Sequence, residues 1–588
     1  MSIARLTAYL LRWLPRVSGL DGQGNSALHY AASQGMVLVI GQLAGKIDFN
    51  SVNRDGRTPL MLAAQNGHGD AIRMLNARGV DVERTRGNGE TALMIAAAAG
   101  RPGAIAALLD SAANLERTNG IGWSALLIAA AYDKPEALAA LLERGANLTR
   151  TDNHGWSALL IAAANNSIKV IAELVARHVD LEQMTPAGVT ALMLAATHGC
   201  VAIVDALASE GVNLDRANER GTTALMGAAQ FGHAAAIEAL AARGANIDLT
   251  DRLGTTALLL AAAGGHVAAI EALAARGAAV NHATPSGVTA LMFVAKQGHA
   301  AAVGALAARG AHVDLADRIG MTALMFAARS GRAEAIKALA ACGAALNLTN
   351  PRGLTAVMLA AQQGHVAAIE ALAAGGAQLD LATPNGKTAL MFAAENERIE
   401  AIGKLVERGV KLETTDENRW SALMIAAVHG KTAALQALAA HGATLDHADH
   451  SGMTALMIAA QEGNAAMVAT LTGNGATADL ADQQGKTALM FAARKGRTTI
   501  VEALLASGAD PKRSDNTGRS VLMHAADAAD AAIIATLVNA GVNVHHTDND
   551  GWNAVMIASR NDHVAAILML AAAGALKTGP CLCDITQV

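Results

Sequence analysis

The sequence predicts an all-α solenoid in which helix-turn-helix units follow one another and are joined by hairpin-like loops. Three observations predict this fold. A nearly identical unit recurs along the 588 residues, each unit holds two helical segments that end at glycine, and a polar stretch with Asp and Gly three apart separates the units. Such a chain is expected to form one array of stacked repeats with no separate globular domain.

The period of the array is marked by the leucine of a TALM-like tetrapeptide. The first interval between markers is 32 residues and the other fifteen are 33. The markers are Leu28, Leu60, Leu93, Leu126, Leu159, Leu192, Leu225, Leu258, Leu291, Leu324, Val357, Leu390, Leu423, Leu456, Leu489, Leu522 and Val555. We therefore expect seventeen repeats over residues 21–575, with residues 1–20 before them and a short tail, residues 576–588, after them.

Each element of a repeat follows from its residues. The position two before the marker is Ser, Thr or Asn in all seventeen repeats, and these side chains can accept a backbone N–H at the start of a helix. The first helix, as in TALMFAARSG, and the second, as in AEAIKALAACG, both end at a glycine. The closing glycine of the second helix is replaced by Ala112 and His178 in two repeats. Those two residues must either avoid the left-handed conformation or bear strain.

These residues resemble the ankyrin repeat. The pattern G-x-T-P-L-H-x-A-A-x-x-G-H is visible from Gly56 to His68, and L-L-x-x-G-A is visible over residues 141–147. Two departures stand out: the proline survives only at Pro59, and the histidine survives only as His29. Thirteen repeats have methionine at the histidine position, a form similar to the long ankyrin-only proteins that are expanded in some flagellated protists.

The resemblance implies a non-enzymatic scaffold or adaptor that binds protein partners along a concave, loop-lined face. The position directly before the helix cap lies near those loops, and four of the five tryptophans occupy it. Tryptophan is enriched among interface anchors, whereas the alternative is that these side chains only pack on the neighbouring loop. The candidate partner-binding residues are Trp123, Trp156, Val189, Val288, Met321, Leu354, Trp420, Met453 and Trp552.

A second function is a host-directed effector or regulatory inhibitor built on the same repeats. A translocation signal at the N-terminus would favour it. Residues 1–20 carry Arg5, Arg12 and Arg16 beside an apolar stripe, which predicts an amphipathic capping helix, with a targeting segment as the alternative.

The sequence predicts no catalytic residue, no cofactor and no metal site. The methionine column is interpreted as core packing. Histidines such as His68 and His233 recur after the first helix, but equivalent atoms of neighbouring repeats lie about 10 Å apart, too far to share one zinc ion, so we expect them to stabilise turns. The Gly-Lys-Thr triplets at Gly386 and Gly485 lack the upstream glycine of a phosphate-binding loop.

Charge and composition limit the partners and the location. The net charge is −5 without a block of one sign, and no run is apolar enough for a membrane span, so neither nucleic acid nor a bilayer is expected as a partner. Four scattered cysteines predict a reducing, cytoplasmic location, with cytoskeletal association as one possibility.

The C-terminal end of the chain carries two further signals. Thr586, Gln587 and Val588 match the C-terminal form that a PDZ domain captures. Leu568 makes the last helix unusually apolar, which predicts that something covers it.

Overall fold

The computed structural model describes residues 19–43 and 47–575, and these residues form 34 α-helices without a β-strand. The helices follow one another as 17 pairs, each with a first and a second helix. This confirms the predicted all-α solenoid of helix-turn-helix units. The predicted capping helix lies outside the described residues except for residues 19 and 20, and the tail lies wholly outside them, so both stay predictions together with the boundaries of the array.

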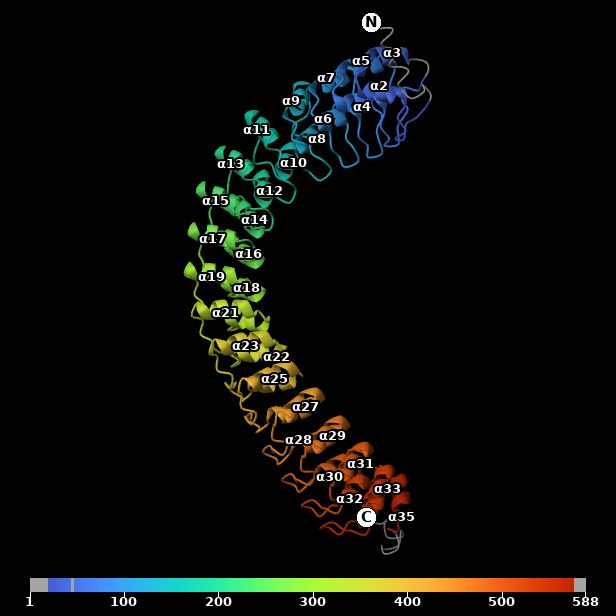
Figure 1. Cartoon of the computed structure of the whole chain (residues 1–588), viewed down its shortest axis with the longest axis vertical. Helices are drawn as coiled ribbons and strands as arrows, with labels where there is room; N and C mark the ends of the chain where they lie inside the picture. Colours follow the sequence, from blue (N-terminus) through green and yellow to red (C-terminus); the bar gives the residue numbers. More distant parts are fainter. Residues whose placement is uncertain (1–18, 44–46, 576–588) are drawn as a thin grey trace. The chain divides into compact units, whose positions relative to one another are not determined.

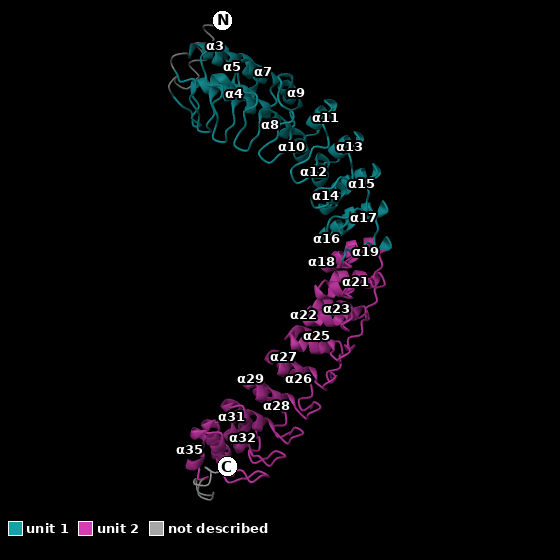
Figure 2. Cartoon of the chain, turned by 180° about the vertical axis from the view of Figure 1, so that it is seen from behind, with its two compact units in different colours: residues 1–285, 308–310 teal, residues 286–307, 311–588 magenta. Residues whose placement is uncertain are grey.

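The helices belong to two compact units, which are described separately (Figure 2). Unit 1 comprises residues 1–285 and 308–310. Its helices are α2 (Ala27–Ser33), α3 (Val37–Gln42), α4 (Pro59–Asn66), α5 (Gly69–Asn76), α6 (Ala92–Ala98), α7 (Pro102–Asp110), α8 (Ala125–Ala131), α9 (Pro135–Glu143), α10 (Ala158–Ala164), α11 (Ile168–Ala176), α12 (Ala191–Thr197), α13 (Val201–Ser209), α14 (Ala224–Gln230), α15 (Ala234–Ala242), α16 (Ala257–Gly264) and α17 (Val267–Ala275).

Unit 2 comprises residues 286–307 and 311–588, so only the last residue of α19 falls in unit 1. Its helices are α18 (Ala290–Gln297), α19 (Ala300–Ala308), α20 (Ala323–Arg329), α21 (Ala333–Ala341), α22 (Ala356–Gln363), α23 (Val366–Ala374), α24 (Ala389–Glu395), α25 (Ile399–Glu407), α26 (Ala422–Val428), α27 (Thr432–Ala440), α28 (Ala455–Glu462), α29 (Ala465–Gly473), α30 (Ala488–Arg494), α31 (Thr498–Ala506), α32 (Val521–Asp527), α33 (Ala531–Asn539), α34 (Ala554–Arg560) and α35 (Val564–Ala572).

The helices form two layers within each unit. First helices such as α4, α6 and α8 pack against one another, second helices such as α5, α7 and α9 do the same, and the loops project on the side of the first helices (Figure 1). The core between the layers consists of alanine and medium-sized aliphatic side chains. In α14 and α15, for example, Leu225, Ala228, Ala229, Ile237 and Leu240 are all at most 1% exposed. Small residues allow adjacent helices to approach closely, which explains the high alanine content.

The predicted caps start the first helices. Fourteen of the seventeen cap side chains accept a hydrogen bond from the backbone N–H three residues later, as Thr223 does from Met226. The exceptions are Ser157, Thr487 and Ser520. Because a cap contributes about 1 kcal/mol, these three first helices begin with less local support.

The methionine column is core packing, as predicted, and it also supports the caps. Twelve of its thirteen members are at most 5% exposed, and only Met556 of the last pair is half-buried. In repeats such as that of Thr58, the cap N–H points to the sulfur of the methionine (Met61 Sδ, 3.4 Å). His29 offers Nδ1 to Ser26 N–H in the same way (3.2 Å), so the weakly accepting thioether takes the place of the imidazole.

Residues in the left-handed backbone conformation close the turns that follow the helices. Ala112 (φ 64°) and His178 (φ 54°) adopt the left-handed conformation, so they bear the strain that was one of the two predicted outcomes. Six further residues have positive φ that was not predicted from the sequence: Asp133, Asn166, Glu397, Arg419, Ala529 and Asp562. None of the helices in the described ranges has the length and apolar character needed to cross a membrane.

Candidate partner-binding face

Most loops fold on the carboxylate or amide of their first residue, whereas Thr185 and Thr383 offer a hydroxyl instead. Asp152 Oδ1 accepts the backbone N–H groups of His154 (2.8 Å) and Trp156 (2.9 Å). An isolated antiparallel bridge joins Thr151 to the cap Ser157, and nine loops have such a bridge. The loops are therefore hairpin-like, as predicted, and an Asx turn holds most of the tips.

Neighbouring loops also touch each other. Arg252 N–H donates to Arg220 O of the preceding loop (3.2 Å), and Glu417 N–H donates to Asn385 O (3.1 Å). A Cβ built on Gly221 would lie 2.9 Å from the backbone nitrogen of Arg252. At Gly221, glycine accommodates both the positive φ (81°) and this close approach.

The nine candidate residues form a row along these loops, which we call the pre-cap row: Trp123, Trp156, Val189, Val288, Met321, Leu354, Trp420, Met453 and Trp552. None of them is fully exposed. Met321 is buried (2% exposed) and the other eight are half-buried. Each unit thus presents its part of the row as a partly covered apolar edge between loops and first helices.

Several members of the pre-cap row bond to the first residue of the next loop. Trp123 Nε1 donates to Asp152 Oδ2 (3.1 Å), and Trp420 Nε1 donates to Asp449 Oδ2 (3.2 Å). Trp552 has the Arg560 guanidinium 5.3 Å from its ring centroid. These contacts support the packing role considered as the alternative in the sequence analysis. A partner-binding role of the same side chains stays a prediction, because a half-buried residue can pack and also bind.

The carboxylate below Trp420 is held in its charged form. Burial of Asp449 acts to raise its pKa, but hydrogen bonds from Ser451, from the Met453 N–H and from the Trp420 indole outweigh burial and lower the pKa below its ordinary value. A charged acceptor strengthens the indole hydrogen bond, so Trp420 is held firmly between two loops.

An acidic column, which was not predicted, links successive repeats in the stretch between the second helix and the following loop. Glu83 Oε1 accepts the Asn114 backbone N–H (2.7 Å) while Oε2 accepts Arg117 Nη1 (3.0 Å). Acidic residues with the same period accept the N–H found 31 residues later: Glu83, Glu116, Glu182, Asp215, Asp248, Asp314, Asp380, Glu413, Asp446 and Asp479. The recurrence of an acid at one position of the 33-residue period was the available signal.

The recurrent histidines bind carbonyl groups at the end of the preceding first helix. His68 approaches Ser33 O (3.0 Å), His233 approaches Thr197 O (3.0 Å), and Arg398 Nε takes the same role toward Gln362 O (3.2 Å). They stabilise turns, as predicted, by satisfying carbonyls left without a partner at a helix end. Nowhere in the described ranges do three or more His, Cys, Asp or Glu side chains gather closely enough to hold a metal ion.

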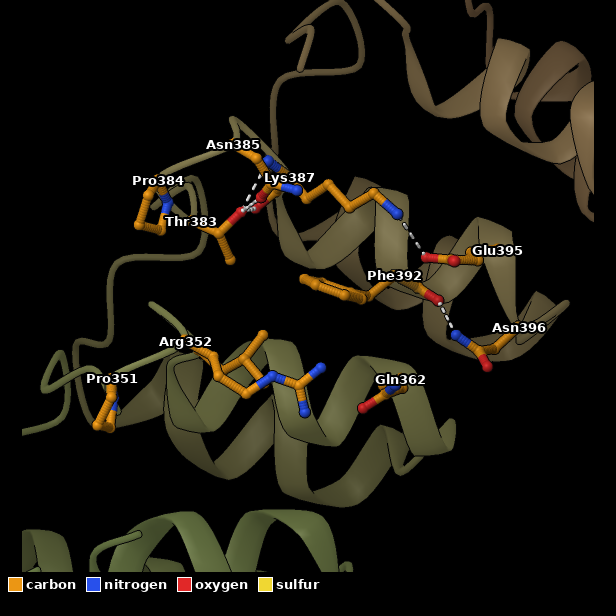
Figure 3. A pocket seen from close by; sticks show the side chains of 11 residues that line it. Pro351, Arg352, Gln362, Thr383, Pro384, Asn385, Lys387, Phe392, Glu395 and Asn396 are labelled. Atoms are coloured by element: carbon orange, nitrogen blue, oxygen red, sulfur yellow. Dashed lines mark hydrogen bonds and ion pairs between the residues drawn. The ribbon is translucent and has the colours of Figure 1, made fainter. Parts of the chain in front are cut away.

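Two adjoining pockets deepen the face in unit 2. One, of about 470 Å³, lies between α22 and α24 and is lined by Arg352, Leu354, Lys387, Phe392 and Glu395 among others (Figure 3). The other, of about 570 Å³, shares Arg352, Leu354 and Gln362 with the first and adds Met321 and Arg329. We call the two together the Arg352 groove. Met321 and Leu354 are the two members of the pre-cap row that line it.

The comparison with family models agrees with this architecture. The family described as "Ankyrin repeats (3 copies)" matches overlapping segments that together run over residues 6–579. The comparison with curated proteins gives no match. Among solved structures, the human ASB11 ankyrin repeat domain is 27% identical, with 38% of this chain and 98% of that chain covered and a TM-score of 0.34.

Proposed function

The chain belongs to the ankyrin-repeat family, and from this premise we propose that it is a non-enzymatic scaffold or adaptor that binds protein partners along its loop-lined face. Ankyrin repeats are generally protein-interaction modules. Binding would spread many modest contacts over several repeats, with the tryptophans of the pre-cap row as anchors.

The observation that carries the proposal is the partly covered apolar row. Eight of its nine side chains keep some exposed surface, and several lie on loops that bond to a neighbouring loop, as Gly120 N–H of the Trp123 loop does to Asn88 O (3.2 Å). A preorganised anchor loses little conformational freedom on binding, so such a row is suited to recognition.

The test is affinity purification with mass spectrometry. Wild type is compared with Trp123→Ala, Trp156→Ala and Trp420→Ala, and we expect the loss of at least one reproducible partner. If every captured protein persists with all three variants, the row is packing only and the proposal fails in this form.

A matched control separates binding from folding. Arg276→Ala changes an exposed residue that directly follows α17 and lies outside the pre-cap row, and it should leave the set of partners unchanged. Circular dichroism of each tryptophan variant shows whether the helices persist. A variant that loses partners but retains wild-type helicity supports the proposal.

The alternative of a host-directed effector or regulatory inhibitor depends on residues 1–20, most of which lie outside the described residues. It stays a prediction. We place the function in the reducing cytoplasm because Cys200 and Cys342 are free thiols. Cytoskeletal association and capture of Thr586, Gln587 and Val588 by a PDZ domain also stay predictions, since those three residues lie outside the described range.

A further inference from the structure

The Arg352 groove holds cations that have no partner in the described part of the chain. Arg329 and Arg352 are both exposed, and neither forms an ion pair or a side-chain hydrogen bond with a described residue. The third cation, Lys387, donates to Glu395 Oε2 (3.0 Å). The groove is therefore lined by three cationic side chains and one carboxylate, and the two arginines carry the surplus positive charge.

The floor of the groove is apolar. Met321 is buried, Leu354 and Phe392 are half-buried, and the Lys387 Nζ lies 5.8 Å from the centroid of the Phe392 ring. In Figure 3, the Arg352 side chain and the Phe392 ring face the same space between α22 and α24. A ligand in this space would touch an apolar surface and a guanidinium group at once.

The loops at the groove lack a bond that other loops make. Several other loops donate an N–H to the preceding loop, as Arg318 does to Ser286 O (3.1 Å), although Pro186 and Pro285 remove the donor in two further loops. Pro351 and Pro384 occupy the donor position in the next two loops, and proline has no N–H. The carbonyl oxygens of Ile319 and Arg352 consequently accept no hydrogen bond from a described residue.

We propose that the Arg352 groove binds an extended acidic peptide segment of a partner protein. Carboxylates of the segment pair with Arg329 and Arg352, an apolar side chain packs on Leu354 and Phe392, and the two loop carbonyls are available to its backbone N–H groups. This inference deepens the proposed function and rests on it.

Charge and geometry favour a peptide over the other polyanion that arginines attract. A nucleic acid would be repelled by the net charge of −5, whereas a short acidic segment meets only the local cations. The planar guanidinium group matches a carboxylate in a bidentate manner, and the apolar floor offers a place for the side chain next to it.

The probe is a set of synthetic peptides in a Gly-Ser background, each with one phenylalanine and two glutamates at varied spacing. Fluorescence polarisation with the full-length chain should show saturable binding of at least one peptide, which weakens with added salt. The double variant Arg329→Glu with Arg352→Glu should bind that peptide at least about tenfold more weakly. Replacing both glutamates by glutamine should have a similar effect.

The control variant has the same change in charge at residues that do not line the groove. Arg78→Glu with Arg276→Glu alters two exposed turns that follow second helices, and it should leave peptide affinity unchanged. The inference is overturned if no peptide binds, if the control weakens binding equally, or if a single-stranded oligonucleotide displaces the peptide more effectively than unlabelled peptide does. Because the tryptophan variants are tested by partner capture, the proposed function can stand when this inference fails.

Discussion

The loop side and the outer turns of the repeats use glycine in the same left-handed conformation but under different constraints. In unit 2, Gly386 of a loop has φ 83° and Gly376 of the turn after α23 has φ 92°. A Cβ on Gly386 would lie 2.7 Å from Asp416 Cα of the next loop, whereas a Cβ on Gly376 would meet nothing within 4 Å. Neighbouring repeats are therefore in close contact at the loops, while the outer turns have free space.

This difference shows where the repeats are coupled. The loop side also has the loop-to-loop hydrogen bonds and the indole hydrogen bonds of Trp123 and Trp420. In a repeat array, stability depends on such interfaces between neighbours. The face that we propose for binding is thus the stiff face, which suits recognition with little loss of entropy.

The largest expected effect is a difference between two substitutions in one repeat. Gly386→Ala combines left-handed strain with a backbone clash and should destabilise the local repeats by about 3 kcal/mol or more. Gly376→Ala has the strain alone and should cost about 1 kcal/mol. Hydrogen exchange of the α24 to α27 amides measures both locally, because repeat arrays need not unfold as one unit.

Equal losses of protection in these two variants would contradict the comparison. Equal losses would mean that the next loop moves aside freely, so that the repeats are coupled by contacts other than those of the loops. Arg419 is the natural case to inspect alongside them, since it occupies the loop glycine position with φ 62° and a full side chain.

The second effect tests the outer turns alone. Ala112→Gly should stabilise its repeat by about 0.5–1 kcal/mol, because relief of left-handed strain exceeds the added freedom of the unfolded chain. Ala139→Gly, in the middle of α9, should instead cost about 1 kcal/mol. Urea denaturation followed by circular dichroism compares the two. Destabilisation by Ala112→Gly would show that contacts outweigh conformation even at the open turns.

Much of the fold could be predicted from the sequence because it is local. The cap Thr223, the buried Met226 and the strained Ala112 each depend on residues within one repeat, and the 33-residue period copies that environment along the chain. Asp133 and Asn166 carried the same kind of signal, since they replace the glycine after a first helix. Their positive φ was not predicted because only the turn after the second helix was checked for missing glycines.

The candidate site was predicted less completely because it depends on distances between repeats. The pre-cap row was predicted, but the period alone does not show that the Trp123 indole reaches Asp152, whereas at Trp156 the equivalent position of the next loop is Thr185 and no such bond forms. The Arg352 groove depends on Pro384, Arg352 and Phe392 meeting from different positions of two repeats. Comparing equivalent positions of the repeats one at a time does not show that these residues come together in space.

A third, smaller effect separates two tryptophans of the same row. Trp123→Phe removes the indole hydrogen bond to Asp152 and should cost about 1 kcal/mol beyond the loss of ring area. Trp156→Phe loses ring area only, since no described residue accepts a hydrogen bond from its indole. Thermal unfolding of the two variants gives the difference. If Trp156→Phe is as costly, the hydrogen bond contributes nothing and ring packing alone joins the loops.

The smallest expected effect is a response to pH on the loop side of unit 2. His524 in α32 is 3% exposed, and its Nε2 lies 3.0 Å from Asp515 Oδ2. Burial lowers the pKa of His524, aided by Arg494 and Lys486, although Asp515 opposes this. The unfolded chain therefore binds the proton more readily, so stability is present above the ordinary histidine value of 6.5 and is lost as the pH falls below it.

Asp515 extends the loss of stability to more acidic pH. Burial acts to raise its pKa, but hydrogen bonds from Thr517, from the Arg519 N–H and from His524 lower it overall, so its contribution disappears as the pH falls through that depressed value. Hydrogen exchange of α32 at pH 7 and pH 5, corrected for intrinsic rates, should show weaker protection at pH 5. His524→Leu, which introduces the residue found at Leu194, should abolish this change and retain only the acid-side loss. An unchanged pH 5 response in His524→Leu would assign the sensitivity to other carboxylates, and the loop side would then be coupled by packing without a titratable contribution from this pair.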